Sequence, residues 1–253
     1  LKSATISLAV TTELPLIIVD VQRAGPSTGI PTKTEQADLL MAMHGRHGEA
    51  PLPVLAIASP ADAFDTMIEA VRIALRYMTP VIVLSDGYIA NSAEPWLLPD
   101  LEALPDISVP FVTAPNGESG FLPYLRDPRT LARGWAAPGT PGLEHRIGGL
   151  EKEDVTGEVS HSPANHDRMV QLREQKVAGI AADIPEVVVD EDPGAELLVL
   201  GWGSTYPAIF AGVRQARFAW RIPMASSRTA TRVGIESIRR RRKSVISCSG
   251  AMT

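Results

Sequence analysis

Cysteine is almost absent from this chain: its 253 residues include one, Cys248. A single thiol cannot close an internal disulfide, and it cannot supply the thiolates of an iron–sulfur cluster. Long hydrophobic runs are also lacking, since no apolar stretch approaches the roughly 18 residues that a membrane span needs. The first residues show no basic segment followed by an apolar one, which is the pattern of a secretory signal. Together these absences predict a cytoplasmic chain that has no membrane contact.

Charge is distributed unevenly along the chain. From Arg214 onward, nine arginines and one lysine stand against a single acid, Glu236, whereas the preceding 213 residues hold 14 basic and 28 acidic residues. The overall net charge of −5 hides this contrast. An acidic body argues against nucleic-acid binding by most of the chain.

The most informative stretch joins a strand to a helix through a loop that contains two glycines and two prolines. Residues 14–21 are mostly apolar, which is typical of a parallel strand covered on both faces. Thr32 and Glu35 then match a capping box, with Thr32 as the N-cap of a helix whose N–H groups favour an anion. Arg23, at the carboxyl end of the strand, could clamp a carboxylate or phosphate there. The pattern also fits a plain connection in which Arg23 pairs with a surface carboxylate.

The order of the expected elements indicates an α/β fold with a mostly parallel sheet, because strands alternate with helices. Beyond the first strand, apolar patterns predict further strands at residues 53–59 and 80–85, and helices at 35–44 and 60–77. Proline and glycine are frequent from residue 94 to residue 186, which predicts a long irregular connection that contains one helix, 165–181. A strand at 197–202 and a helix from Tyr206 then open a second α/β unit.

Several motifs resemble the α subunit of the 2-oxoacid:ferredoxin oxidoreductases, and the 2-oxoglutarate type is the closest likeness. The longest motif is Gln22-Arg23-x-Gly25-Pro26-Ser27-Thr28-Gly29-x-Pro31-Thr32-x-x-x-Gln36-x-Asp38-Leu39. The likeness continues through Leu84-Ser85-Asp86-Gly87-Tyr88 and through Pro141-Gly142-Leu143-Glu144-His145-Arg146-Ile147-Gly148-Gly149-Leu150-Glu151, and it reaches Val199-Leu200-Gly201-Trp202-Gly203-Ser204. It covers about residues 1 to 213.

The resemblance implies a domain organisation. Residues 1–120 would form a parallel-sheet domain of the pyrimidine type, which holds the aminopyrimidine ring of thiamine diphosphate. Residues 121–190 would form the irregular connection. Residues 191–253 would begin a second α/β domain, similar to the C-terminal domain of transketolase. The family's α subunit starts well before Leu1, so we expect this chain to be an N-terminally incomplete fragment that is inactive alone.

The resemblance also implies the chemistry. The enzyme would oxidatively decarboxylate a 2-oxoacid, pass single electrons to ferredoxin and transfer the acyl group to coenzyme A. Thiamine diphosphate would be shared with a partner β subunit, which would also carry the divalent magnesium ion and the iron–sulfur cluster. The open alternatives are a pyruvate or branched-chain 2-oxoacid variant and a non-catalytic remnant that only binds its partner subunit.

The resemblance assigns site residues within the first loop. Arg23 and Thr32 would bind the carboxylate of the 2-oxoacid. Ala24 stands where the family usually has glycine, and no residue of this chain is assigned to catalysis or to a metal. The residues that would shape the loop near the cofactor are Gly25, Pro26, Ser27, Thr28 and Gly29.

Other polar residues have weaker claims. Asp86 could contact the cofactor or the partner, but a turn-forming role for Asp86-Gly87 is favoured. His145 could line the site or lie at the surface. The pairs His44 with His47 and His161 with His166 have spacings that suit a metal, but no cysteine lies nearby to complete a structural zinc site. Trp202 is expected in the core or at an interface.

The last 36 residues do not continue the family pattern, because residues 218–253 show no clear strand. Residues 239–243 are an unbroken basic run. Three interpretations remain: a tail that binds an acidic partner or nucleic acid, a disordered surface segment, or out-of-frame translation of the second domain. We favour the third. Sequencing the locus tests it, and the hypothesis fails if no other frame encodes a βα continuation.

Overall fold

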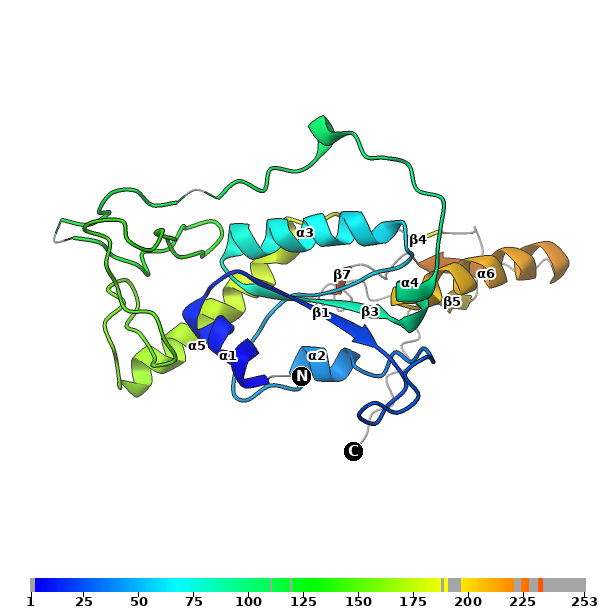
Figure 1. The fold of residues 1–253 in the computed structure, drawn as a ribbon, viewed down its shortest axis with the longest axis horizontal. Helices are drawn as coiled ribbons and strands as arrows, with labels where there is room; N and C mark the ends of the chain where they lie inside the picture. Colours follow the sequence, from blue (N-terminus) through cyan, green and yellow to red (C-terminus); the bar gives the residue numbers. More distant parts are fainter. Residues whose placement is uncertain are drawn as a thin grey trace.

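The computed structural model describes residues 3–109, 111–118, 120–187, 189–190, 197–220, 224–227 and 232–233. Helices and strands alternate along the first ninety residues and again from residue 197 (Figure 1). The elements, in chain order, are α1 Ser3–Thr12, β1 Leu16–Gln22, α2 Leu39–His44, β2 Val54–Ala56, α3 Asp62–Tyr77, β3 Pro80–Asp86, α4 Gly87–Asn91, η1 Leu101–Ala103, α5 Pro163–Gly179, η2 Ile180–Ala182, β4 Val189–Asp190, β5 Leu197–Val199, η3 Gly203–Thr205, α6 Tyr206–Trp220, β6 Met224–Ser227 and β7 Arg232–Val233.

The main sheet has the strand order β1-β3-β2-β7. β1 and β2 both pair with β3 in parallel, and the register of the first pair runs from Leu16 opposite Pro80 to Gln22 opposite Asp86. β7 adds to the far edge in the antiparallel sense. A second sheet has the order β4-β6-β5, with β5 and β6 parallel. The predicted α/β fold with a mostly parallel main sheet is confirmed.

β3 is the central strand of the core, because all seven of its residues are buried. Successive side chains of a strand point to opposite faces of its sheet. Val81 and Val83 accordingly pack with α3, whereas Ile82 and Leu84 pack with α1, including Ile6. Figure 1 shows the same arrangement, with α3 on one side of the sheet and α1 and α2 on the other. The sheet is therefore covered on both faces, as the apolar run at residues 80–85 predicts.

Two expectations for the first domain need correction, and one of its helices was not predicted. β1 is an edge strand rather than one covered on both faces, since Val19 and Val21 are each 48% exposed. The helix predicted for residues 35–44 begins only at Leu39. Helix α1 was not predicted, because its apolar residues do not gather on one face of a helix, and the sequence pattern therefore gives little helical signal.

The second half of the chain agrees with the sequence in outline. α5 and α6 lie close to the predicted helices, and β5 occupies part of the predicted strand at 197–202. The expectation of no strand after residue 218 is wrong for β6 and β7. The hypothesis that residues 218–253 are translated out of frame falls mostly on residues that the structure does not describe, including the basic run at 239–243. Among all the residues that the structure describes, no helix is both long and apolar enough to cross a membrane.

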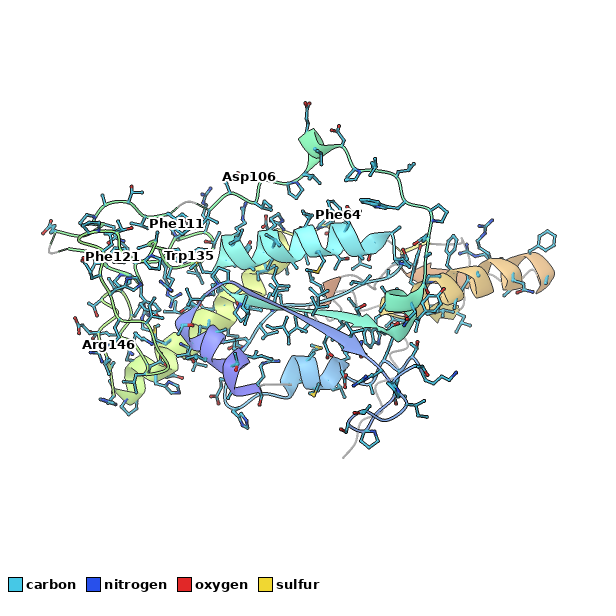
Figure 2. The ribbon with its side chains drawn as sticks, viewed as in Figure 1. Phe64, Asp106, Phe111, Phe121, Trp135 and Arg146 are labelled. Carbon is cyan, nitrogen blue, oxygen red and sulfur yellow. The ribbon has the colours of Figure 1, made fainter. Side chains whose placement is uncertain are left out.

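Residues 92–162, which we call the irregular segment, contain no helix or strand other than η1 among their described residues. Aromatic contacts hold parts of this segment in place (Figure 2). Trp96 packs against Phe64 of α3 with ring centroids 5.4 Å apart, and Phe111 packs against Trp135 at 5.0 Å. Such pairs contribute about 0.5–1.5 kcal/mol beyond their burial.

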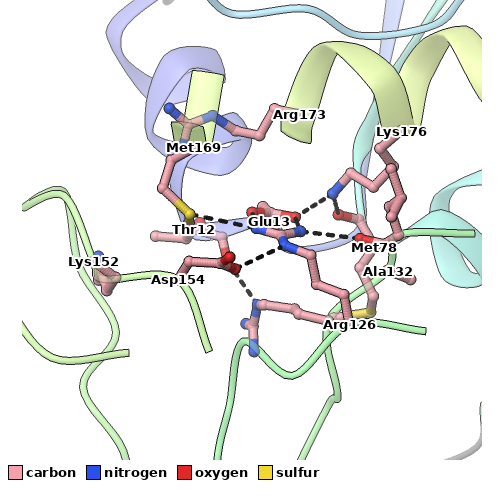
Figure 3. Close-up of polar contacts among 12 residues, drawn as sticks. Thr12, Glu13, Met78, Arg126, Ala132, Lys152, Asp154, Met169, Arg173 and Lys176 are labelled. Carbon is pink, nitrogen blue, oxygen red and sulfur yellow. Dashed lines mark hydrogen bonds and ion pairs between the residues drawn. The ribbon is translucent and has the colours of Figure 1, made fainter. Parts of the chain in front are cut away.

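A buried ion cluster joins the irregular segment to the sheet domain. Glu13, which follows α1 and is 1% exposed, accepts two hydrogen bonds from the guanidinium of Arg126, at 2.7 and 2.8 Å. Lys176 of α5 donates to the same carboxylate and also to the Met78 carbonyl, 3.0 Å away. Figure 3 shows these contacts together with Asp154, which lies 3.6 Å from Arg126 Nε. Three segments far apart in the sequence thus share one carboxylate.

The electrostatics of this cluster decide its protonation. Burial alone would raise the pKa of Glu13, but Lys176 and Arg126 outweigh burial and lower that pKa to about 2. Burial also lowers the pKa of Lys176 to about 8, against the opposing effect of Glu13. The pair is therefore charged on both sides near neutral pH.

We expect Glu13→Gln to lower the free energy of unfolding by about 3–5 kcal/mol, because it leaves two buried cations without their carboxylate. Urea denaturation measures the change. Asp167→Asn is the matched control, since it removes an exposed carboxylate of α5 and should change the stability by about 0.5 kcal/mol or less. Equal effects of the two substitutions would contradict the assigned role of Glu13.

The depressed pKa of Glu13 also predicts a pH dependence. The unfolded carboxyl group titrates near 4.5 and the folded one near 2, so the unfolded state binds more protons between these values. The stabilisation by Glu13 is therefore present above about pH 4.5 and is lost as the pH falls towards 2. Thermal unfolding of the wild type and of Glu13→Gln should converge over this range. A constant difference between them would refute the prediction.

Candidate functional site

The candidate site is the loop of residues 22–36, which leaves the carboxyl end of β1. Because β1 and β3 are parallel and in register up to Gln22 and Asp86, the loop lies at the edge where both strands end. Open α/β sheets bind their ligands at this edge. Gln22 fixes the start of the loop: its buried side chain donates to the Ser85 carbonyl at 3.0 Å and accepts from the Asp38 N–H at 3.1 Å.

The backbone of the loop folds back on itself. Ala24 N–H donates to the Lys33 carbonyl at 3.0 Å, and Ile30 N–H donates to the Ala24 carbonyl at 3.0 Å. These bonds bring the backbone next to Arg23 close to the backbone next to Thr32. Arg23 and Thr32 thus occupy neighbouring positions of the loop, and both are exposed.

Gly29 has a position that only glycine fits. Its φ is +45°, and a Cβ there would lie 2.1 Å from the Ala24 carbonyl oxygen. Ser27 also has a positive φ, of 54°, and the peptide bond between Gly25 and Pro26 is cis. Of the residues expected to shape the loop, Gly29 is therefore one that no residue with a side chain could replace without moving the backbone.

The capping box predicted for Thr32 and Glu35 is wrong. No helix begins at Thr32: residues 32–38 are irregular, and the N-cap of α2 is Asp38. Glu35 Oε2 instead accepts a hydrogen bond from the Gly25 N–H at 3.0 Å, across the loop. Because no helix begins at Thr32, no helix N-terminus is available there to bind an anion. The exposed side chains of Arg23 and Thr32 are the remaining candidate anion ligands of the loop.

A polar junction anchors the far end of the loop. Gln36 Nε2 donates to Asp86 Oδ2 at 2.8 Å and to Ser204 Oγ at 2.6 Å, and Ser204 also donates to Asp86. The other oxygen of Asp86 accepts from the N–H groups of Tyr88 and Ile89, which caps α4. Asp86 is therefore a turn-forming residue, as favoured, and is also the acceptor that joins the loop to η3.

The sequence alone did not identify Gln36 or Ser204 as partners of Asp86. Their separation along the chain reaches 168 residues, so no local pattern could reveal the contact. All three residues do stand within the family-like motifs, which was the only available signal. Gly203 belongs to the same junction, because a Cβ there would lie 3.1 Å from Gln36 Nε2.

Asp20 is a further residue to which the sequence analysis assigned no role. One of its carboxylate oxygens is buried and has no hydrogen-bond partner among the described residues. Burial raises the pKa of Asp20, and the nearby Asp38 raises it further. A perturbed carboxyl group near the carboxyl end of β1 is typical of functional sites, although ion networks also produce such shifts.

The remaining candidates have other surroundings. His145 packs edge-on against Phe121, and its Nδ1 lies 2.9 Å from the Leu143 carbonyl. His166 pairs with Glu151 at 2.7 Å. Trp202 packs against the core, as expected. Over the part of the chain that the structure describes, no group of three or more His, Cys, Asp and Glu side chains could hold a metal ion.

The chain is similar to known proteins over most of its length. A family model described as pyruvate flavodoxin/ferredoxin oxidoreductase, thiamine diphosphate-binding, matches residues 1–163. The 2-oxoglutarate oxidoreductase subunit KorA of Mycobacterium tuberculosis is 59% identical over 218 residues, which are 86% of this chain and 33% of that protein. The 2-oxoglutarate synthase subunit KorA of Methanothermobacter marburgensis is 30% identical over 84% of this chain and 55% of its own length.

A solved structure is similar in fold. It is a 2-oxoglutarate:ferredoxin oxidoreductase from Magnetococcus marinus with 2-oxoglutarate, coenzyme A and succinyl-CoA bound, with a TM-score of 0.78 and 32% identity over 88% of this chain and 38% of that one. The chain thus spans about a third of the length of the Mycobacterium protein and of this structure. The resemblance found in the sequence is confirmed, and the chain belongs to the thiamine diphosphate-binding family of pyruvate flavodoxin/ferredoxin oxidoreductases.

Proposed function

We propose that this chain is part of an α subunit of a thiamine diphosphate-dependent 2-oxoacid:ferredoxin oxidoreductase that acts on 2-oxoglutarate in the cytoplasm. The reaction would convert the 2-oxoacid and coenzyme A into carbon dioxide and an acyl-CoA, and two electrons would leave singly to ferredoxin. The observation that carries the proposal is the folded loop at the carboxyl ends of β1 and β3, which carries the family motif.

Arg23 and Thr32 would bind the carboxylate of the 2-oxoacid. A guanidinium offers two parallel N–H donors that match the two oxygens of a carboxylate, and the hydroxyl of Thr32 adds a third donor. A hydrogen bond to a charged group contributes about 1.5–3 kcal/mol. Both residues are exposed at neighbouring positions of the loop, so they are accessible to a substrate.

The backbone of the loop would supply orientation. The bonds of Ala24 with Ile30 and Lys33, and that of Gly25 with Glu35, fix the loop before a substrate arrives. A site held in its binding geometry loses less conformational freedom on binding, which favours affinity. The junction of Gln36 with Asp86 would hold the end of the loop against β3.

Thiamine diphosphate, when bound, supplies the electron sink for decarboxylation. The loop residues fit the anionic substrate, and none of them is assigned to the cofactor itself. A partner β subunit would hold the diphosphate, the magnesium ion and the iron–sulfur cluster, as the family resemblance implies. The single cysteine of this chain cannot supply the ligands of a cluster.

Co-expression with a β subunit tests the proposal. We expect a stable complex that reduces a viologen dye when 2-oxoglutarate and coenzyme A are supplied. Pyruvate and a branched-chain 2-oxoacid, assayed in parallel, identify the preferred substrate. A stable complex without reduction by any of the three acids would show that the chain is a non-catalytic remnant.

In such a complex, Arg23→Lys should lower kcat/KM for the 2-oxoacid at least about tenfold, because a point charge cannot replace a planar pair of donors. A tenfold loss corresponds to about 1.4 kcal/mol. Lys33→Ala is the control, since it removes another exposed basic side chain of the same loop. Unchanged kcat/KM for Arg23→Lys would remove Arg23 from the site.

Gly29→Ala should raise the KM for the 2-oxoacid severalfold, because the new Cβ would displace the Ala24 carbonyl and distort the loop. Backbone strain of this kind costs about 1–3 kcal/mol. Gly48→Ala is the matched control, since Gly48 also has a positive φ, of 66°, but a Cβ there meets no atom within 4 Å. Steady-state kinetics compares the two variants, and equal effects on KM would refute the role of the loop.

A further inference from the structure

The loop after β1 has few contacts that fix its position against the rest of the protein. Residues 25–35 are all exposed, so the packing of their side chains contributes little. The internal backbone bonds give the loop a shape, but they do not attach it to the sheet. Its attachments lie at its two ends, where Gln22 is buried and Gln36 is partly buried. These two side chains therefore decide where the loop stands.

Asp86 receives the end of the loop that carries Gln36. Its carboxylate ends β3 and is 2% exposed. One oxygen, Oδ1, accepts from the backbone N–H groups of Tyr88 and Ile89, at 2.8 and 3.1 Å. The other, Oδ2, accepts from Gln36 Nε2 at 2.8 Å and from the Ser204 hydroxyl. Hydrogen bonds to a carboxylate are stronger than those between neutral groups, so this acceptor holds the loop end firmly.

Ser204 reaches the same carboxylate from the second α/β unit, because it belongs to η3 at the start of α6. Figure 1 shows α4 and α6 at the end of the sheet where the loop after β1 lies. The Ser204 hydroxyl donates to Asp86 and accepts from Gln36 Nε2 at 2.6 Å. A side-chain amide has two N–H donors, and those of Gln36 are thus shared between the carboxylate and the hydroxyl. Without the hydroxyl, the amide would keep only one of these two partners.

The position of η3 is fixed by contacts that do not involve the loop. Thr205 Oγ1 accepts from the Trp202 N–H at 3.2 Å and donates to the Trp202 carbonyl at 2.6 Å. The Trp202 side chain packs against the apolar core on the α1 face of the sheet. Gly203 has a φ of +60°, and a Cβ there would lie 3.1 Å from Gln36 Nε2. The backbone of η3 is therefore a fixed surface that the loop end approaches closely.

We propose that Ser204 is a positioning residue of the 2-oxoacid site, which acts through Gln36 and Asp86. The second α/β unit thereby sets the position in which the loop presents Arg23 and Thr32. Ser204 acts through the two neighbouring side chains and not on the substrate itself. The identity of the substrate rests on the proposed function, whereas the position of the loop can be measured without any substrate.

Kinetics of the complex with a β subunit test the effect on substrate binding. Ser204→Ala should raise the KM for 2-oxoglutarate severalfold, because the loop loses part of its attachment, and should leave kcat and the KM for coenzyme A unchanged. A serine needed only for folding would lower the amount of active complex, and thus the apparent kcat, without changing KM. Ser160→Ala is the matched control and should change neither constant. Ser160 is also partly exposed, and its hydroxyl accepts a hydrogen bond within the irregular segment.

A double-mutant cycle tests the path through Gln36. Gln36→Leu removes both amide donors and should raise the same KM. Because the two substitutions interrupt one connection, the KM of the double variant should match that of the more affected single variant. If the two effects on KM multiply, Ser204 and Gln36 act separately and the proposal is overturned.

Hydrogen exchange of the loop tests the proposal without the reaction. In the 253-residue chain, the N–H groups of Ala24 and Ile30 should exchange faster in Ser204→Ala than in the wild type, because a loop with a weaker attachment opens more often. Ser160→Ala should exchange at the wild-type rate. Unchanged exchange in Ser204→Ala, or an unchanged KM in an active complex, would overturn the proposal. If the wild-type complex reduces no dye with any 2-oxoacid, the proposed function fails, and loop exchange alone decides the role of Ser204.

Discussion

The structure depends on one buried carboxylate, that of Glu13. Its position directly after α1 brings Arg126 of the irregular segment and Lys176 of α5 to the edge of the sheet domain. The irregular segment has few regular hydrogen-bond ladders of its own, so contacts of this kind hold it in place. Breaking a buried ion pair is far more costly than losing an exposed one, because the remaining charges keep their desolvation penalty. The cluster therefore explains how a long connection without helices or strands can take a defined position.

The two ends of the molecule use charge in different ways. At the carboxyl ends of β1 and β3, a loop fixed by its own backbone bonds presents the exposed side chains of Arg23 and Thr32. A substrate can reach these side chains without disturbing the core. In the irregular segment, the cations Arg133 and Lys152 are buried and have only carbonyl acceptors. The first arrangement suits an exchanging substrate, whereas the buried cations of the second are held inside the protein by backbone carbonyls.

Features set by neighbouring residues could be predicted from the sequence, whereas contacts between distant segments could not. The strands β1 and β3 were predicted from apolar runs and the helix α3 from apolar periodicity, which are local properties. The capping box at Thr32 failed because its residues satisfy other partners: Glu35 accepts from Gly25 across the loop. The junction of Gln36, Asp86 and Ser204 could not be predicted, because it joins positions far apart along the chain.

The sequence by itself determined the family, the alternation of strands and helices, and the identity of the loop with Arg23 and Gly29. Those features depend on residue type and spacing within short windows, which a single chain carries in full. Only the tertiary structure decided that β1 is an exposed edge, that Glu13 is buried between two cations, and that Gln36 and Ser204 meet at Asp86. Burial and charge pairing depend on which distant segments pack together, and the order of residues along the chain does not show that directly.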